Sequence, residues 1–345
     1  MITRIGLDLG YANITLSDAT AEIYREPSIA LIRKAPKVGE PRIVAVGNAA
    51  LTPDSESASD SMLIRPFKNG MFFDHQLTEE VIMTALAPVR GKGDLRVVVG
   101  VPSDILPKQE KELLAMLDKA GVDSAFFVSR PVAAVIGAGY SPSISAVSVN
   151  FGGMSTEVAV LHGGSVIYSH RTPLGGEDFD RAVKQYVLEQ GDVNISLMVA
   201  RAIKERLGAV WKGRPNDSID IEGTLALTGN KLKMNIATED IVGVFEKPIQ
   251  ELINAIVDAL KNVPQNAVEA VLENGIILTG GASELYGLDI LLSKVLGISV
   301  TRPERAIDCV AKGLSRINGF IPTKTKLSGK NITAQLALLY SATKK

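Results

Sequence analysis

The sequence predicts an α/β protein with two related halves. Apolar strand-like runs alternate with amphipathic helix-like runs along most of the chain, as is typical of this class. Two units of strand, glycine turn and strand begin at residues 2 and 146, and each ends its first strand with an Asp or Asn, one apolar residue and a glycine. These positions, Asp8 and Asn150, are 142 residues apart (150 − 8). The 345 residues are also enough for two domains of ~150 residues.

The composition excludes several function classes. Lys and Arg number 37 against 38 Asp and Glu, so the net charge of −1 provides no basic field for nucleic acid. The single cysteine, Cys309, excludes an internal disulfide and a cysteine-built metal site. The three histidines, His75, His162 and His170, lack metal-ligand spacing. No apolar run approaches the ~20 residues that span a bilayer, so we expect a cytoplasmic protein.

The first half begins with a predicted β-hairpin, because residues 2–9 and 12–16 are apolar runs around a glycine-containing turn. The amphipathic run 107–120 predicts a helix that ends at Gly121. Residues 31–64 are polar and rich in Pro, Ser and Asp, and are interpreted as a small irregular insertion. The other elements expected here are strands at 96–102 and 125–128 and a helix at 131–139.

The second half repeats the alternation of strands and helices. Strands are expected at 146–151, 156–161, 165–168, 218–228, 275–279 and 298–301, and helices at 177–189, 195–210, 248–262 and 284–296. We therefore predict domain I at 1–145, with a small subdomain at about 31–64 and the return of 306–345. Domain II is predicted at 146–305, with a small subdomain at about 181–250. The basic tail after Phe320 is expected to be solvated or disordered.

Three glycine turns, each after an apolar strand, carry the functional prediction. They are Asp8-Leu9-Gly10, Asn150-Phe151-Gly152-Gly153 and Leu278-Thr279-Gly280-Gly281-Ala282-Ser283. Glycine lets backbone amides approach a phosphate or a nucleoside closely. In this order, with an acid in the first, the turns resemble the two phosphate loops and the adenosine loop of the actin-like ATPase superfamily. Glycines that serve only the turns are the alternative interpretation.

Within that superfamily the chain resembles the MreB family of bacterial actins over about residues 1–320. The segments similar to this family are 62–70, 131–139, 156–160, 175–180, 287–289 and 309–311. The resemblance implies an actin-like fold of two RNase H-like domains, each carrying a small subdomain, with a nucleotide cleft between them. It also implies ATP and Mg²⁺ as cofactors, and as partners other copies of the chain in protofilaments together with cytoskeletal adaptor proteins.

The same resemblance assigns site residues. The first phosphate loop is Gly10, Tyr11, Ala12 and Asn13, the second is Gly152, Gly153, Met154 and Ser155, and the adenosine side is Arg201, Lys204, Glu205, Gly280, Gly281 and Ala282. Asp8 is assigned to a hydrated Mg²⁺, and Asp8, Arg130 and Asn150 occupy the catalytic positions. Glu205 is the candidate ribose contact, because Arg201 and Ala202 stand where the family has an acidic pair.

Two catalytic positions depart from the family pattern. Asn150 stands where the family has Asp, which removes one negative charge facing the metal ion. Arg130 stands where the family has the Glu that positions the attacking water. Arginine is always protonated and accepts no proton, although its guanidinium is suited to contact a γ-phosphate. Tyr11 and Met154 also add bulk to the phosphate loops. We therefore expect a filament subunit that binds ATP but hydrolyses it slowly or not at all.

Other functions on the same fold stay open. A plasmid-segregating filament is one, and a non-polymerising adaptor or a small-molecule kinase is another, with Asp74, Asp178 or Asp180 as the candidate base of the kinase. Membrane attachment is disfavoured, because the sequence starts with the first strand and the loop at 89–94 is polar and short.

Overall fold

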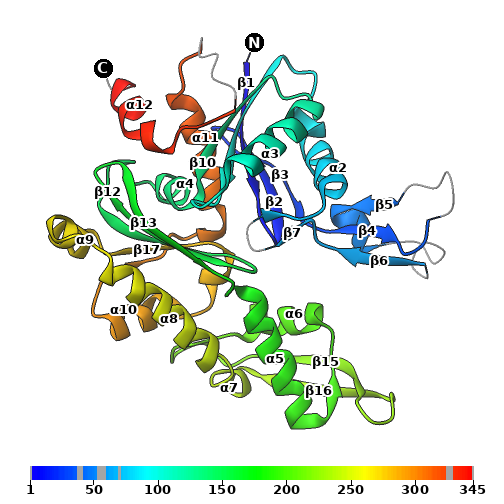
Figure 1. Cartoon of the computed structure of the whole chain (residues 1–345). Helices are drawn as coiled ribbons and strands as arrows, with labels where there is room; N and C mark the ends of the chain where they lie inside the picture. The colour runs from blue at the N-terminus through cyan, green and yellow to red at the C-terminus, as the bar shows by residue number, and fades with distance from the viewer. Residues whose placement is uncertain (1, 37–41, 53–59, 69–70, 324–328, 344–345) are drawn as a thin grey trace. The chain divides into compact units, whose positions relative to one another are not determined.

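The computed structural model describes residues 2–36, 42–52, 60–68, 71–323 and 329–343 of the chain. It shows an α/β protein in which the chain divides into two compact units (Figure 1). Unit 1 consists of residues 1–145, 161–169 and 308–345, and unit 2 of residues 146–160 and 170–307. Unit 1 thus contains both ends of the chain. The small subdomains expected within each unit stay predictions.

The sheet of unit 1 has the strand order β19-β10-β9-β1-β2-β3. Its strands are β1 (Ile2–Leu9), β2 (Asn13–Ser17), β3 (Glu22–Pro27), β9 (Asp94–Val101), β10 (Ser124–Ser129) and β19 (Lys330–Asn331). The neighbours β1, β9 and β10 run parallel, whereas β1, β2 and β3 form an antiparallel meander. Because parallel strands end at the same sheet edge, the residues that follow β1 and β10 lie close together.

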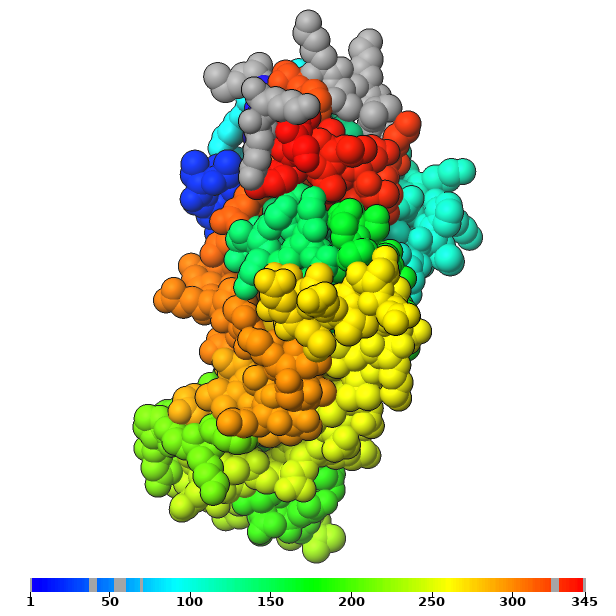
Figure 2. Space-filling model, turned by 90° about the vertical axis from the view of Figure 1, so that its left-hand side faces the viewer, coloured from blue at the N-terminus to red at the C-terminus, as the bar shows by residue number. Residues whose placement is uncertain are grey.

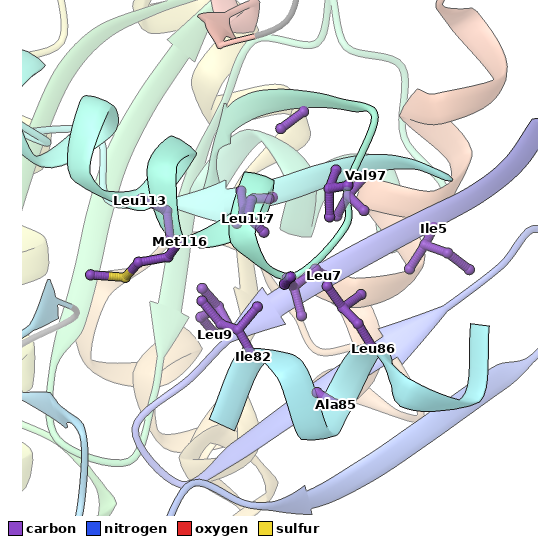
Figure 3. Packing of buried hydrophobic residues seen from close by; sticks show 14 of the residues in the cluster. Ile5, Leu7, Leu9, Ile82, Ala85, Leu86, Val97, Leu113, Met116 and Leu117 are labelled. Atoms are coloured by element: carbon purple, nitrogen blue, oxygen red, sulfur yellow. The ribbon is translucent and has the colours of Figure 1, made fainter. Parts of the chain in front are cut away.

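The side chains of β1 point alternately to the two faces of the sheet, and this determines the face on which Asp8 lies. Ile5, Leu7 and Leu9 belong to the core formed with α2 (His75–Leu86) and α3 (Pro107–Lys119) (Figure 3). Successive side chains of a strand point to opposite faces, so Gly6 and Asp8 face the other side of the sheet. On that side a Cβ on Gly6 would lie 2.5 Å from the backbone nitrogen of Ser315 in α11 (Cys309–Phe320).

Helix α2 begins at a capping aspartate that also forms an ion pair. The Asp74 carboxylate accepts a hydrogen bond from the Leu77 backbone N–H (3.0 Å) and pairs with Arg42 Nη2 (2.7 Å). Burial raises the pKa of Asp74, but the hydrogen bonds from Arg42 and Leu77 outweigh it and leave the pKa below its ordinary value. A depressed carboxyl pKa stabilises the fold above the ordinary value near 4, and this contribution is lost as the pH falls below it.

We expect Asp74→Ala to lower the free energy of unfolding by about 1–2 kcal/mol, the typical cost of a lost N-cap. Asp74→Asn keeps an oxygen for the Leu77 amide but loses the charge, so it should cost less. Thermal unfolding at pH 7 and pH 3 measures both variants. The difference between wild type and Asp74→Asn should shrink at pH 3, because below the ordinary pKa near 4 the carboxyl of the unfolded wild-type chain takes up a proton and the depressed pKa of the folded chain then contributes less stability. A difference that grows at pH 3 would contradict the assignment.

The segment at 31–64 was wrongly predicted to be irregular. It contains an antiparallel sheet of order β5-β4-β6, made of Ala30–Arg33 (β4), Ile43–Val46 (β5) and Ser61–Ile64 (β6). The short strands form because Ile29, Leu31 and Ala50 make one apolar cluster and Ala30, Ile32 and Leu77 make another. Residues 37–41 and 53–59 of this segment lie outside the described residues. A short hairpin, β7 (Phe67–Lys68) and β8 (Met71–Phe72), follows.

The expectation of a disordered tail is also wrong for residues 329–343. β19 adds to the sheet as a parallel neighbour of β10, and Ile332 and Leu336 are 2% and 0% exposed. Helix α12 (Leu336–Ala342) forms the red surface in Figure 2, and its Ala337 lies against Gly164. Its apolar residues therefore hold the tail on unit 1. Residues 324–328 lie outside the described part of the chain.

Unit 2 is built on a sheet of order β13-β12-β11-β17-β18, in which β11, β17 and β18 are parallel. A second sheet, β14-β15-β16, contains a hairpin where a single strand was predicted at 218–228. The strands are β11 (Ala146–Phe151), β12 (Thr156–His162), β13 (Ser165–Thr172), β14 (Val193–Asn194), β15 (Ser218–Leu225), β16 (Lys231–Ala237), β17 (Ile276–Thr279) and β18 (Val300–Thr301). The tip of the β12–β13 hairpin, residues 161–169, belongs to unit 1.

Helices cover the sheets of unit 2. They are α5 (Gly176–Gly191), α6 (Leu197–Leu207), α7 (Thr238–Ile241), α8 (Glu246–Lys261), α9 (Val268–Asn274) and α10 (Leu288–Leu296). The rings of Phe151, Phe179 and Phe245 join β11, α5 and the start of α8, with centroids 5.5 and 5.3 Å apart. Within the described ranges of the chain, no helix is long and apolar enough to cross a bilayer.

Candidate functional site

The first two glycine turns have the same geometry, one in each unit. In unit 1 the Gly10 N–H donates to the Asn13 carbonyl (3.1 Å), and in unit 2 the Gly152 N–H donates to the Ser155 carbonyl (3.0 Å). A Cβ on Gly10 would lie 2.7 Å from the Asn13 oxygen, and one on Gly152 would lie 3.0 Å from the Ser155 oxygen. A side chain would therefore collide with the backbone at Gly10 and would be tightly packed against it at Gly152. A tight turn without a side chain at its start suits the close approach of backbone amides to phosphate.

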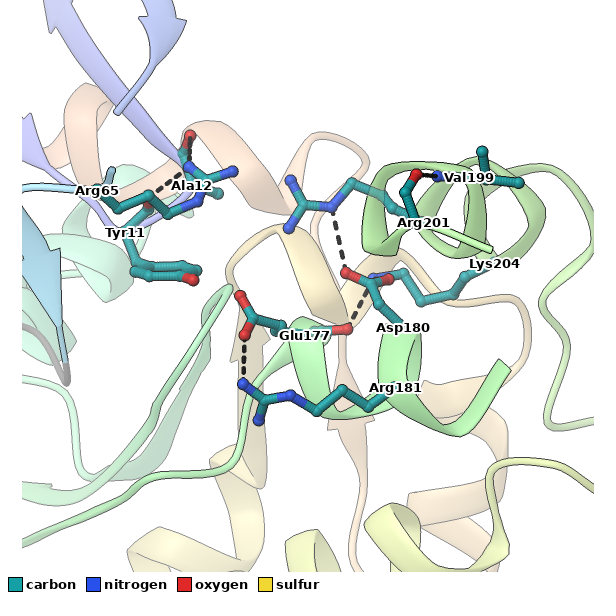
Figure 4. A network of polar contacts seen from close by, with 11 residues as sticks. Tyr11, Ala12, Arg65, Glu177, Asp180, Arg181, Val199, Arg201 and Lys204 are labelled. Atoms are coloured by element: carbon teal, nitrogen blue, oxygen red, sulfur yellow. Dashed lines mark hydrogen bonds and ion pairs between the residues drawn. The ribbon is translucent and has the colours of Figure 1, made fainter. Parts of the chain in front are cut away.

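The unit 1 turn is held from one side by two polar residues. The Ser28 hydroxyl donates to the Gly10 carbonyl (2.6 Å). Arg65 Nη1 donates to the carbonyls of Tyr11 (3.0 Å) and Ala12 (3.3 Å), and its guanidinium lies 4.8 Å from the centroid of the Tyr11 ring (Figure 4). Sequence reasoning assigned no role to Arg65. Its place in the family-like segment 62–70 was the signal that could have found it.

Asp8 and Arg130 form an ion pair beside this turn. Arg130 is the first residue of α4 (Arg130–Gly137), at the carboxyl end of β10. Its Nε lies 3.5 Å from Asp8 Oδ1, and its Nη2 donates to the Leu9 carbonyl (2.9 Å). The two side chains are 19% (Asp8) and 10% (Arg130) exposed. Burial raises the pKa of Asp8 above its ordinary value, against the opposing charges of Arg130 and Arg25.

The donor set at Asp8 does not suit a divalent cation. Mg²⁺ prefers carboxylates that are free to face it. Here one oxygen of Asp8 already faces the Arg130 guanidinium. Two unit charges 4 Å apart interact by about 4 kcal/mol at an effective dielectric constant near 20, and a divalent ion doubles this repulsion. The described residues contain no cluster of three or more His, Cys, Asp or Glu side chains that could hold a metal ion.

The unit 2 turn is held by the start of α5. The backbone N–H groups of Gly176 and Glu177 donate to the carbonyls of Gly152 (2.9 Å) and Gly153 (2.8 Å). A Cβ on Gly175 would collide with the backbone of Met154, which is itself half-buried. The glycine pair at the start of α5, Gly175 and Gly176, thus lets the helix touch the turn. Sequence reasoning placed this pair in a family-like segment but assigned it no site role.

Two of the three predicted contacts on α6 converge on one buried carboxylate. Asp180 of α5 has a side chain only 1% exposed, and it pairs with Lys204 Nζ (2.6 Å) and Arg201 Nε (3.2 Å) (Figure 4). Lys204 also donates to the Gly176 carbonyl (2.9 Å). Glu205 is exposed on α6, outside this network. The cluster leaves one positive charge in excess.

The third glycine turn lies against the second. Gly280 has φ +89°, and a Cβ there would collide with the Phe151 carbonyl and lie 2.8 Å from Asn150 Oδ1. A Cβ on Gly176 would lie 3.4 Å from the Cβ of Ala282, and Gly281 lies beside Ile307. The structure thus gathers the second and third glycine turns and Lys204 within unit 2. The remaining site residues, Gly10 to Asn13, Asp8 and Arg130, are in unit 1.

The carboxylates considered for a kinase base have structural partners. Asp74 caps α2 and pairs with Arg42, and Asp180 pairs with two cations. Asp178 accepts a hydrogen bond from the Gly175 N–H (2.8 Å) at the start of α5. Each of these oxygens already carries out a capping or ion-pair role.

A family model described as MreB/Mbl protein matches residues 2–325. The chain belongs to the MreB/Mbl family. Among curated relatives, the cell shape-determining protein MreB of Escherichia coli is 29% identical over 317 residues, covering 90% of this chain and 91% of the relative. The cell shape-determining protein Mbl of Bacillus cereus is 27% identical over 316 residues, covering 90% and 93%.

Solved structures confirm the predicted actin-like fold of this MreB/Mbl chain. MreB5 of Spiroplasma citri bound to AMPPNP aligns with a TM-score of 0.82 at 20% identity, covering 90% of this chain and 93% of that one. A chain of the MamK double helical filament aligns with a TM-score of 0.77 at 21% identity, covering 93% and 100%. At these identities the likeness establishes the fold alone.

Proposed function

We propose that this MreB/Mbl protein is a cytoskeletal filament subunit of the bacterial-actin type that binds ATP and hydrolyses it slowly or not at all. The observation that carries the proposal is the match of the family model over residues 2–325, in a chain that keeps all three glycine turns. The curated relatives with the same extent are named for determining cell shape.

Nucleotide binding is supported by the shape of the turns. Gly10 and Gly152 start two equivalent hairpin turns, in which a side chain would collide with the backbone at Gly10 and crowd it at Gly152. Gly280, Lys204 and Ala282 lie next to the second turn in unit 2. The fold relative from Spiroplasma citri was solved with AMPPNP and also with ADP. We assign phosphate contacts to the backbone of the first two turns and the nucleoside to the third turn and α6.

Slow hydrolysis follows from the side chains beside the turns. A general base must accept a proton from the attacking water. Arg130 has no acceptor, and its guanidinium is engaged by Asp8 and by the Leu9 carbonyl. Asn150 is neutral, and its Oδ1 lies near Gly280. Asp8 is paired with Arg130. The described residues at these three positions therefore provide no unpaired carboxylate to orient water.

Self-association is supported by the family and by one fold relative. The MamK chain that aligns over its whole length was solved as a double helical filament. We propose that this chain polymerises into protofilaments. Cytoskeletal adaptor proteins stay predicted partners, and the cytoplasm stays the predicted location.

Three measurements on the purified full chain test the proposal. Calorimetric titration with ATP and with AMPPNP should give binding of both. Phosphate release over the same time should stay near background. Electron microscopy should show filaments at high protein concentration. Monomers under every nucleotide condition would overturn the filament assignment, and the absence of any heat of binding would overturn the nucleotide assignment.

A further inference from the structure

We propose that Arg130 is a built-in counter-ion that takes the place of a divalent metal ion at Asp8, so that this chain binds ATP without magnesium. The inference rests on the proposed nucleotide binding and states which cation serves that site. It is carried by the position of the guanidinium, by its partners and by the residues that pack against its stem.

The sheet brings Arg130 to Asp8 across a glycine. Asp8 of β1 pairs in register with Gly100 of β9, and Gly100 pairs with Val128 of β10. Arg130 follows two residues after Val128, so its side chain returns over Gly100 to reach Asp8. A Cβ on Gly100 would lie 3.4 Å from Arg130 Cγ, in contact with the arginine stem. The Arg130 stem therefore packs directly over Gly100.

The Arg130 guanidinium contacts both the Asp8 carboxylate and the backbone next to the Gly10 turn. Its Nε faces Asp8 Oδ1 at 3.5 Å, and its Nη2 donates to the carbonyl of Leu9, the residue directly before the Gly10 turn. The side chain is 10% exposed, and packing holds it there. A cation fixed in this way is present whether or not a metal ion is in solution.

The C-terminal segment of the chain contacts unit 1 at the start of α4, where Arg130 lies. The backbone N–H of Ser129, the residue before Arg130, donates to the hydroxyl of Thr333 (2.9 Å). The hydroxyls of Ser129 and Ser103 lie 2.6 Å apart. These contacts hold the start of α4, and so the origin of the Arg130 side chain, against the edge of the sheet.

The charge of Arg130 neutralises that of Asp8, and this affects how a polyphosphate can bind. A bare carboxylate at Asp8 would repel an incoming polyphosphate unless a cation neutralised it. The Asp8–Arg130 pair sums to zero, so phosphate oxygens can approach the Gly10 turn without a metal ion. A divalent cation at Asp8 would instead have to displace or repel the guanidinium. The residues at this position thus favour phosphate binding with an internal cation.

Calorimetric titration of the wild-type chain with ATP, in MgCl₂ and separately in EDTA, tests the inference directly. The two dissociation constants should agree within about threefold, which is less than 1 kcal/mol. The melting temperature should also rise by a similar amount with ATP in both buffers. Binding that is present in MgCl₂ and lost in EDTA would overturn the inference and leave the proposed nucleotide binding intact. No binding in either buffer would overturn both.

Variants at Arg130 test whether this residue is the cation. Arg130→Ala exposes the Asp8 charge, so affinity in EDTA should fall by about tenfold or more and should recover in MgCl₂. Arg130→Lys keeps the charge and should stay independent of magnesium. Arg42→Ala is the matched control, because it removes an ion-paired arginine of the same unit. An Arg130→Ala protein whose affinity is unchanged in EDTA would overturn the assignment, and the wild-type comparison decides the question if that variant fails to fold.

Discussion

Replacing Gly313 with alanine should lower the free energy of unfolding by about 3 kcal/mol or more, near the upper end of the cost of overpacking. Gly313 lies in α11 where this helix crosses α4 with backbones in contact. A Cβ on Gly313 would overlap the carbonyl oxygen of Ala133 and lie 3.0 Å from the Gly137 nitrogen. Gly137 faces the Cys309 carbonyl in the same way. Backbone atoms of a helix cannot rotate aside as a flexible side chain does, so the two helices must separate.

The separation would also disturb the site, because α4 starts at Arg130. Thermal unfolding followed by circular dichroism measures the effect. For a folding unit of 150–250 residues, 1 kcal/mol corresponds to about 2–4 °C, so the melting temperature should fall by roughly 6–12 °C.

Gly319→Ala is the matched control on the same helix. A Cβ on Gly319 would have no neighbouring atom within 4 Å. Alanine has the higher helix propensity by up to about 1 kcal/mol, so this variant should be neutral or slightly stabilising. Equal losses at the two glycines would show that helix propensity, not the contact between α4 and α11, sets the cost.

Local pattern predicted much of the fold. Apolar runs such as 96–102 and 125–128 are β9 (Asp94–Val101) and β10 (Ser124–Ser129), because buried parallel strands are continuously apolar. The errors have a common physical cause. The strands at Ala30–Arg33 and Lys330–Asn331 are short and gain their stability from partners distant in sequence. The local pattern of apolar and polar residues therefore did not predict them.

In the candidate site, too, the local features could be predicted from the sequence and the long-range contacts could not. The glycine turns could be predicted locally, because a position that tolerates no side chain is occupied by glycine in the sequence. The partners of those turns are not local. Arg65 reaches Tyr11 across 54 positions, and Arg130 reaches the Leu9 carbonyl across 121. The family resemblance singled out Arg130, and its charge suited a phosphate contact. The register of three strands places it on Asp8.

Asp180→Ala should lower the free energy of unfolding by about 3–5 kcal/mol, the usual cost of removing one partner from a buried ion pair. The Asp180 side chain is 1% exposed, and the cations that it holds, Arg201 and Lys204, are 28% and 13% exposed. Without the carboxylate, two positive charges of α6 would face each other with no counter-ion. Asp180→Asn keeps the volume and loses the charge, so it should be nearly as damaging if charge is the cause.

The exposed pair between Arg206 and Asp217 provides the control, since Arg206 is on the same helix as Arg201 and Lys204. Both of its side chains are about half exposed, at 51% and 45%, and water screens such pairs strongly. Asp217→Ala should therefore leave the unfolding temperature almost unchanged. Because Lys204 also donates to the Gly176 carbonyl beside the second glycine turn, to which we assign phosphate contacts, Asp180→Ala should weaken ATP binding as well. An Asp180→Ala protein that unfolds like wild type would show that Arg201 and Lys204 are stable without this carboxylate, which would contradict the role assigned to it.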